Sequence, residues 1–141
     1  MQRSATAVWD GDLKTGKGTL STQSGVLKQH AYDFNSRFED GRNTNPEELI
    51  AAAHAGCFTM ALAAELGKAG ITPKRLQTDA KLTLDRIDGK PTVVGIALSL
   101  RAEVPGADKA VVAATAEGAR SGCVISRLLS APITLTTDIV V

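Results

Sequence analysis

Two cysteines, Cys57 and Cys123, are the residues of this chain best suited to redox chemistry. Cys57 lies in the long apolar stretch 45–62, where a free cysteine packs as a small hydrophobic residue at least as readily as it reacts. Cys123 follows Ser121-Gly122 and is predicted near a helix N-terminus, where free N–H groups and the helix dipole favour a thiolate. Its structural alternative is a cysteine packed beneath a turn, so these patterns alone leave both roles open.

A metal site is a second chemistry that these residues allow. His54 and Cys57 are three residues apart on one face of a predicted helix, and with Cys123 they would supply three ligands of the kind zinc prefers. No fourth protein ligand is evident. We therefore expect His54 to be a half-buried polar residue bonded to a backbone carbonyl.

Arg37 is flanked by Phe34 and Phe38 in a segment whose alternation predicts a strand. A guanidinium among aromatic side chains would seek a carboxylate such as Glu47 for a bidentate pair. The alternative, a solvent-facing arginine whose stem passes its neighbours, is the one that the residues alone favour. Glu47 likewise has a simple explanation as a first-turn acid that complements the helix dipole.

Composition narrows the class of protein. The 141 residues suit one domain, 1–141, and the net charge of +1 lacks the basic excess of a nucleic-acid binder. The first six residues have no apolar run of a signal peptide, and no charge-free apolar run reaches the roughly 18 residues of a membrane span. We expect a cytoplasmic protein that acts on neither nucleic acid nor membrane, in a compartment where a permanent structural disulfide is disfavoured.

The longest helical signal begins at Asn45, which is predicted to cap a helix that has Pro46 in its first position and Glu48 in a capping box. The helix should end at Gly67 or Gly70, either of which suits a left-handed C-cap. It has almost no polar face, which is typical of a helix that is covered from several sides.

The other elements follow from alternation and turn signals. Strands are predicted over 2–9, 17–23, 31–38, 75–87 and 94–104, helices over 108–120 and 124–130, and a last strand after Pro132. This order indicates an α+β domain in which antiparallel sheets curve around the helix that carries Cys57. Two short sheets can scarcely cover so apolar a helix, so we expect a homodimer with an isologous interface.

The whole chain resembles the OsmC/Ohr family, and most of all its OsmC (osmotically inducible protein C) branch, thiol peroxidases that reduce organic hydroperoxides. The resemblance is carried by Trp9-Asp10-Gly11-Asp12, Gly16-Lys17-Gly18-Thr19, Ser24-Gly25-Val26-Leu27, Phe34-Asn35-Ser36-Arg37-Phe38, the stretch from Thr44-Asn45-Pro46-Glu47 to Ala55-Gly56-Cys57-Phe58, and Gly122-Cys123 through Ser126. The run from Asn45 to Phe58, followed by a second cysteine, is specific.

The resemblance implies an intertwined homodimer with two active sites at the subunit interface. Cys57 would be the peroxidatic cysteine, Cys123 the resolving cysteine, and Arg37 and Glu47 the catalytic Arg and Glu. The reductant would be a small dithiol or a dihydrolipoyl protein, and the chemistry needs no metal or organic cofactor. Val124 stands where many relatives carry Pro, which puts in question only the fine geometry of the resolving loop.

Spacing adds a constraint. Glu47 and Cys57 are ten residues apart, roughly 15 Å along a straight helix and about 80° around it. Arg37 can serve both only if a helix break or the other subunit shortens the gap. An apolar setting of Phe34, Phe38, Phe58, Met60 and Leu62 would suit a bulky organic peroxide. A dimeric redox sensor and a binder of apolar ligands with inert cysteines are the competing functions.

Overall fold

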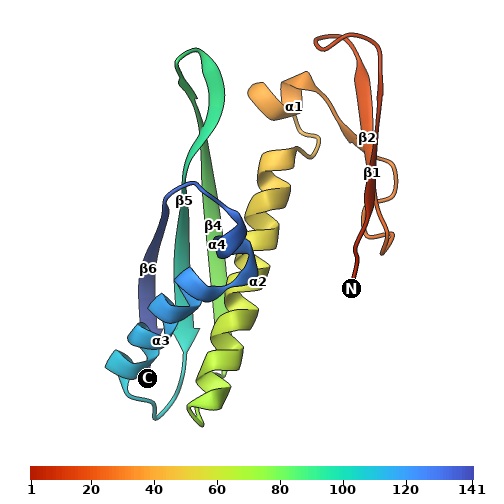
Figure 1. The fold of residues 1–141 in the computed structure, drawn as a ribbon. Helices are drawn as coiled ribbons and strands as arrows, with labels where there is room; N and C mark the ends of the chain where they lie inside the picture. The colour runs from red at the N-terminus through yellow and green to blue at the C-terminus, as the bar shows by residue number, and fades with distance from the viewer. The chain divides into compact units, whose positions relative to one another are not determined.

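The computed structural model describes residues 1–141, which divide into two compact units, Met1–Leu49 and Ile50–Val141. The single domain over 1–141 stays a prediction. The element order βββ-αα-ββ-αα-β contains every predicted element and one further helix, and the predicted α+β class is confirmed (Figure 1).

The first unit is built on a three-stranded antiparallel sheet. Its strands β1 (Ala5–Asp10), β2 (Lys17–Thr22) and β3 (His30–Tyr32) lie in the order β1-β2-β3. Gly18 pairs with Trp9 on one side and Tyr32 on the other, and the two rings meet edge-on with centroids 5.4 Å apart. A β-carbon at Gly18 would collide with both rings, so the aromatic pair requires glycine there.

The predicted strand 31–38 is correct only in its first residues, because Phe34–Phe38 forms a short helix, α1. Asp33 caps it: the Asp33 carboxylate accepts the Ser36 N–H at 2.8 Å, and the Ser36 hydroxyl accepts the Asp33 N–H at 3.0 Å. The positions of Phe34 and Phe38 fit a strand and a helix equally, since a spacing of four is shared by both periods. Their rings, 5.0 Å apart, pack as an i, i+4 pair.

The long helix α2 spans Pro46–Lys68 without interruption. Asn45 caps it as predicted, accepting the Glu48 N–H at 2.8 Å, but the Glu48 carboxylate accepts the Thr44 hydroxyl at 2.6 Å and the reciprocal half of the predicted capping box is absent. Gly70, at φ +71°, terminates the helix, because Ile71 N–H reaches the Leu66 carbonyl at 2.9 Å in a Schellman pattern. Of the two predicted end points, Gly70 is the correct one.

The second unit contains a mixed sheet of β4 (Arg75–Ile87), β5 (Lys90–Glu103) and β6 (Ile133–Val140). β4 and β5 form the predicted antiparallel hairpin, which turns at Asp88-Gly89 with φ of 50° and 77°. β6 runs parallel to β5, which corrects the prediction of wholly antiparallel sheets. The reason is the crossover through α3 (Lys109–Gly122) and α4 (Val124–Leu128), which returns the chain to the middle of β5, where Ile133 pairs with Ile96 (Figure 1).

The core of this unit lies between one face of the mixed sheet and the helices α2 and α3. The side chains that form it are Phe58, Leu62 and Leu66 of α2, Ile96, Leu98, Leu100 and Ala102 of β5, Val104 directly after β5, Val112, Ala116 and Ala119 of α3, Cys123 at the end of α3, and Ile139 of β6. A bulge opposite Thr83/Leu84 shifts the phase of β5, so Val93, rather than the predicted Val94, packs against this core.

Helix α2 is not covered on all sides by the single chain, in agreement with the expectation that two short sheets can scarcely cover so apolar a helix. Its buried residues are His54, Phe58, Leu62 and Leu66, which lie on one face at a spacing of four. Met60, on another face, is 76 % exposed. By length and composition α2 would also be apolar enough to span a membrane, with a mean hydropathy of 1.5. Part of the apolar surface of α2 is therefore exposed in the single chain.

Candidate active site

The two cysteines, 66 positions apart in the sequence, meet in the second unit as free thiols. Cys57 lies on α2 and is half-buried, whereas Cys123 is buried at the junction where α3 ends and α4 begins. The backbone N–H of Ile125, in the first turn of α4, points at the Cys57 sulfur from 3.5 Å. The junction between α3 and α4 therefore brings the Cys123 sulfur next to α2. A reaction between Cys57 and Cys123 requires this proximity.

Hydrogen bonds from Ser126 surround the Cys123 sulfur. The Ser126 backbone N–H lies 3.3 Å from Cys123 Sγ, and the Ser126 hydroxyl oxygen lies 3.1 Å from it. Burial by itself would raise the pKa of Cys123, but these two hydrogen bonds and the neighbouring Cys57 thiol outweigh it, and the pKa is lowered. The prediction that Cys123 stands at a helix N-terminus is confirmed, since it is the N-cap of α4.

Cys57 shows the opposite tendency. Burial raises its pKa, and the adjacent Cys123 thiol adds to the rise, while the N–H groups of Ile125 and Val124 act in the other direction. Cys57 is nevertheless the more accessible of the two sulfurs. Within the second unit, then, the accessible thiol is the one that needs further help to ionise.

His54 is completely buried, with 0 % of its surface exposed, and it is bonded to a side chain rather than to the expected backbone carbonyl. Its Nε2 lies 2.7 Å from the Ser126 hydroxyl oxygen, and its Nδ1 has no hydrogen-bond partner. Burial lowers the pKa of His54. No group of three His, Cys, Asp or Glu side chains in the chain has the arrangement of a metal site.

Arg37 and Glu47 form the other pair of predicted residues, within the first unit. Arg37 Nε and Nη2 donate to Glu47 Oε1 at 3.0 and 2.9 Å, and Nε also donates to Oε2 at 3.3 Å, so the bidentate contact is present although the Arg37 side chain remains 44 % exposed. Arg37 also lies over the Phe38 ring, 5.1 Å from its centroid. Asn45 ties α1 to the start of α2, because its Nδ2 donates to the Ser36 carbonyl at 3.1 Å.

An aromatic pocket of about 320 Å³ adjoins Arg37 in the first unit. Its lining consists of Trp9, Leu13, Tyr32, Asp33, Phe34, Arg37 and Phe38. Trp9, Leu13 and Tyr32 were not among the predicted apolar surroundings, although the chain has only one Trp and one Tyr, which is a signal that could have drawn attention to them. Phe58 and Leu62 were predicted to surround a substrate, but both are fully buried in the core and cannot do so.

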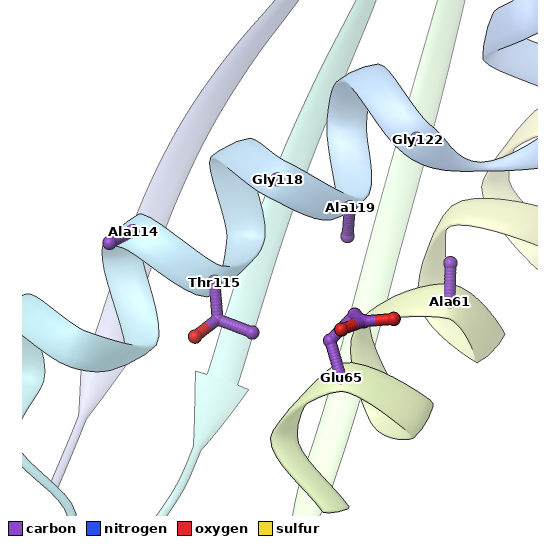
Figure 2. A pocket seen from close by; sticks show the side chains of 7 residues that line it. All are labelled: Ala61, Glu65, Ala114, Thr115, Gly118, Ala119 and Gly122. Carbon is purple, nitrogen blue, oxygen red and sulfur yellow. The ribbon is translucent and has the colours of Figure 1, made fainter. Parts of the chain in front are cut away.

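A second hollow, of about 490 Å³, lies between α2 and α3 (Figure 2). Small side chains line most of it, with Ala61 of α2 and Ala119 of α3 on its two walls and the Glu65 carboxylate at one side. Ala61 follows Cys57 by one helical turn, and Gly122 precedes Cys123. The hollow is therefore lined mainly by small residues and lies close in the chain to both cysteines.

Comparison with known proteins identifies the family. Residues 39–138, more than half of the chain, match the family model described as OsmC-like protein. The chain is 50 % identical over 129 residues to peroxiredoxin OsmC of Escherichia coli, covering 92 % of this chain and 90 % of that protein. It is 33 % identical over 97 residues to an organic hydroperoxide resistance protein of Xanthomonas axonopodis pv. citri, covering 68 % and 66 %. The chain belongs to the OsmC-like protein family, as its motifs predict.

Solved structures share the fold. An OsmC-like protein of unknown function from Vibrio cholerae superposes with a TM-score of 0.79 at 15 % identity, covering 98 % of this chain and 99 % of that one. An OsmC-like protein from Mycoplasma pneumoniae gives a TM-score of 0.76 at 15 % identity, covering 100 % and 99 %. At these identities the likeness concerns the fold alone.

Proposed function

We propose that this protein is a two-cysteine thiol peroxidase that reduces organic hydroperoxides to alcohols. The observation that carries the proposal is the contact between two free thiols of unequal access, Cys57 half-buried and Cys123 buried. The names of its relatives, a peroxiredoxin and an organic hydroperoxide resistance protein, support the same chemistry.

In the first step the Cys57 thiolate attacks the outer oxygen of the hydroperoxide. A sulfur–oxygen bond forms and the O–O bond breaks, so Cys57 becomes a sulfenic acid and the alkoxide leaves as alcohol after taking a proton. In the second step the Cys123 thiolate displaces hydroxide from that sulfenic acid, which gives a Cys57–Cys123 disulfide and water. A dithiol then reduces the disulfide and is itself oxidised to a disulfide.

Accessibility decides which cysteine reacts first. The pKa of Cys123 is lowered, but this residue is only 2 % exposed, so a bulky peroxide has little access to its sulfur. Cys57 is the more open sulfur but has the raised pKa, and a cation must therefore favour its thiolate. We assign that part to Arg37, which Glu47 orients through the bidentate contact.

The unbroken course of α2 bears on how Arg37 reaches Cys57. No helix break shortens the interval between Glu47 and Cys57, which removes one of the two routes that the spacing allowed. The remaining route is a site completed by a second copy of the chain. We therefore propose a homodimer in which the exposed apolar surface of α2, including Ile50 and Met60, is covered by the partner.

The substrate and reductant follow from the chemistry of the site. The aromatic pocket beside Arg37 suits an alkyl or aryl hydroperoxide better than hydrogen peroxide, because its walls offer apolar contact. A disulfide product calls for a dithiol, either a small one or a dihydrolipoyl protein. We place the protein in the cytoplasm, where such reductants keep cysteines reduced.

The decisive experiment is steady-state consumption of an alkyl hydroperoxide with a dithiol as the sole reductant. We expect turnover by the parent protein and none by Cys57→Ser, a change that keeps the side-chain volume nearly constant. A protein that forms the disulfide once but does not turn over would be a redox sensor. A protein that leaves the hydroperoxide untouched would be neither.

A further inference from the structure

A buried row of polar groups leads from α2 to the second sulfur. His54 Nε2 lies 2.7 Å from the Ser126 hydroxyl oxygen, and that oxygen lies 3.1 Å from Cys123 Sγ. All three residues are buried, with His54 at 0 % exposure. The mechanism given above uses only the cysteine of this row, which leaves a buried histidine and a buried serine without a function.

The unpartnered Nδ1 of His54 indicates the direction of the hydrogen bonds. Neutral imidazole carries one proton, on Nδ1 or on Nε2. A proton on Nδ1 would leave a buried N–H donor without an acceptor. A proton on Nε2 can instead be donated to the Ser126 oxygen, and Nδ1 is then only an acceptor without a donor. The Nε2–H tautomer is therefore favoured, and it donates to the Ser126 oxygen.

The hydroxyl of Ser126 has one proton to give. When its oxygen accepts from His54, the remaining acceptor within reach for that proton is the Cys123 sulfur. The reverse direction, from Ser126 to His54, would leave the serine oxygen as an acceptor for the Cys123 thiol and so favour the protonated form. The tautomer of His54 thus decides whether Ser126 favours the thiolate or the thiol of Cys123.

We propose that His54 is a positioning residue for Cys123, because its Nε2–H holds the Ser126 hydroxyl in the orientation that donates to the Cys123 sulfur. Ser126 is the residue that touches the reacting atom, through both its hydroxyl and its backbone N–H. The inference rests on the proposed function in one respect, namely that Cys123 is the sulfur that resolves the sulfenic acid.

The step that this arrangement assists is balanced without any further reactant. The lone pair of the Cys123 thiolate forms the S–S bond with Cys57, the S–O bond of the sulfenic acid breaks, and hydroxide leaves. That hydroxide takes up the equivalent of the proton that Cys123 released, so a thiol and a sulfenic acid become a disulfide and water. Donation from Ser126 raises the fraction of Cys123 that is ready to attack.

The surroundings of Cys123 contain few other groups that would set its ionisation. Its main influences besides burial are Ser126, the Cys57 thiol on α2 and the backbone N–H of Ile125 on α4, and no charged side chain is among them. The contact between His54 and Ser126 is therefore the route by which a substitution of His54 would change the pKa of Cys123.

The test is the pH dependence of Cys123 alkylation by iodoacetamide, measured in a Cys57→Ser background so that one thiol reports. Ser126→Ala and His54→Phe should each raise the pKa of Cys123, and a rise of about one unit slows alkylation roughly tenfold at pH values below both pKa values. His54→Gln retains an N–H donor and should restore most of the rate. In the Ser126→Ala background, His54→Phe should have no further effect on the pKa.

Thr59→Val is the matched control, because it removes a hydrogen bond of α2 to Thr78 without touching the row of residues at Cys123. It should leave the Cys123 titration unchanged. Long-range ¹H–¹⁵N spectra of the parent protein give a second readout, and the chain simplifies it by having only two histidines. His54 should show the Nε2–H tautomer.

An unchanged or lowered Cys123 pKa in folded His54→Phe, or an Nδ1–H tautomer in the parent, would overturn the proposal. Should His54→Phe fail to fold, the tautomer of His54 in the spectra of the parent protein still decides. None of these measurements needs peroxide, so a failed peroxidase assay would disprove the proposed function and leave this result standing. With both cysteines present, Ser126→Ala should slow disulfide formation roughly tenfold while sulfenic acid forms at the parental rate.

Discussion

Arg37 contacts both carboxylate oxygens of Glu47: its Nε and Nη2 donate to Oε1 at 3.0 and 2.9 Å, and its Nε also donates to Oε2 at 3.3 Å. The guanidinium is 44 % exposed and the carboxylate 15 %, so the pair lies at the surface of the first unit with its acid largely covered. The guanidinium carbon of Arg37 also lies over the Phe38 ring, 5.1 Å from its centroid. Orientation, rather than stability, is what such a pair supplies, since half-exposed ion pairs contribute about 1 kcal/mol or less.

Replacing Arg37 by Met removes the positive charge and keeps the apolar contacts of the side-chain stem, so its effect reports on the charge. Unfolding free energy should change by less than about 1 kcal/mol, because the ion pair is partly exposed. The Cys57 pKa should rise further above its ordinary value, and each unit of rise leaves roughly tenfold less thiolate at pH 7. The measurement is the pH titration of Cys57 alkylation in a Cys123→Ser background.

The same titration includes its control. Glu47→Gln should shift the curve in the same direction by a smaller amount, since it removes the group that orients Arg37 and keeps the cation. The loss of rate in Arg37→Met should shrink as the pH is raised. Overlapping curves for the parent and Arg37→Met would mean that Arg37 does not hold the thiolate.

Cys123→Ser should consume a single equivalent of hydroperoxide and then stop. The Cys57 sulfenic acid forms normally, but no thiol is left to displace hydroxide from it, so it accumulates or is oxidised further to sulfinic acid. Intact-mass spectrometry after one equivalent of peroxide should find one added oxygen. Continued turnover with a dithiol, at the parental rate, would assign the resolving step to something other than Cys123.

The sequence predicted the parts of the fold that depend on neighbours along the chain. The start of α2 at Asn45, its end at Gly70 and the hairpin turn at Asp88-Gly89 were all found, because each depends on a residue whose own chemistry sets the backbone. The parallel pairing of β6 was missed, since it depends on how α3 and α4 carry the chain across the sheet.

At the candidate site the residues were easier to predict than their surroundings. The contact of Arg37 with Glu47 was foreseen as one of two outcomes, whereas the link between His54 and Ser126 joins residues 72 positions apart and left no periodic signal. The helix at Phe34–Phe38 was missed because the spacing of its aromatic residues also fits a strand. The capping box between Asp33 and Ser36, which starts the helix, was not recognised in the sequence.

The exposed face of α2 should be the dimer interface. Met60→Lys places a charge on a side chain that is 76 % exposed in the single chain and should shift the protein from dimer to monomer in light scattering. Val111→Lys is the matched control, since Val111 is an exposed apolar residue of α3, and it should leave the mass unchanged. A parent protein that is monomeric at micromolar concentration would rule out the proposed interface.

Stability should fall as the pH drops below about 6.5, and His54 should account for part of the fall. Burial lowers the pKa of His54 below its ordinary value of 6.5. Between that value and the lower folded-state pKa, the unfolded chain binds a proton that the folded chain does not. The unfolding free energy therefore rises with pH in this window and decreases again as the pH falls. For one group its slope is at most about 1.4 kcal/mol per pH unit.

The comparison of two histidine variants isolates this contribution. Urea unfolding of parent, His54→Gln and His30→Gln between pH 8 and 5, at one fixed protomer concentration, should give parallel pH dependence for the parent and His30→Gln, since His30 is exposed. His54→Gln should show a shallower dependence below pH 6.5, because its side chain cannot take up a proton when the chain unfolds. Equal slopes for all three proteins would mean that His54 titrates alike in the folded and unfolded states, and that its burial carries no electrostatic cost.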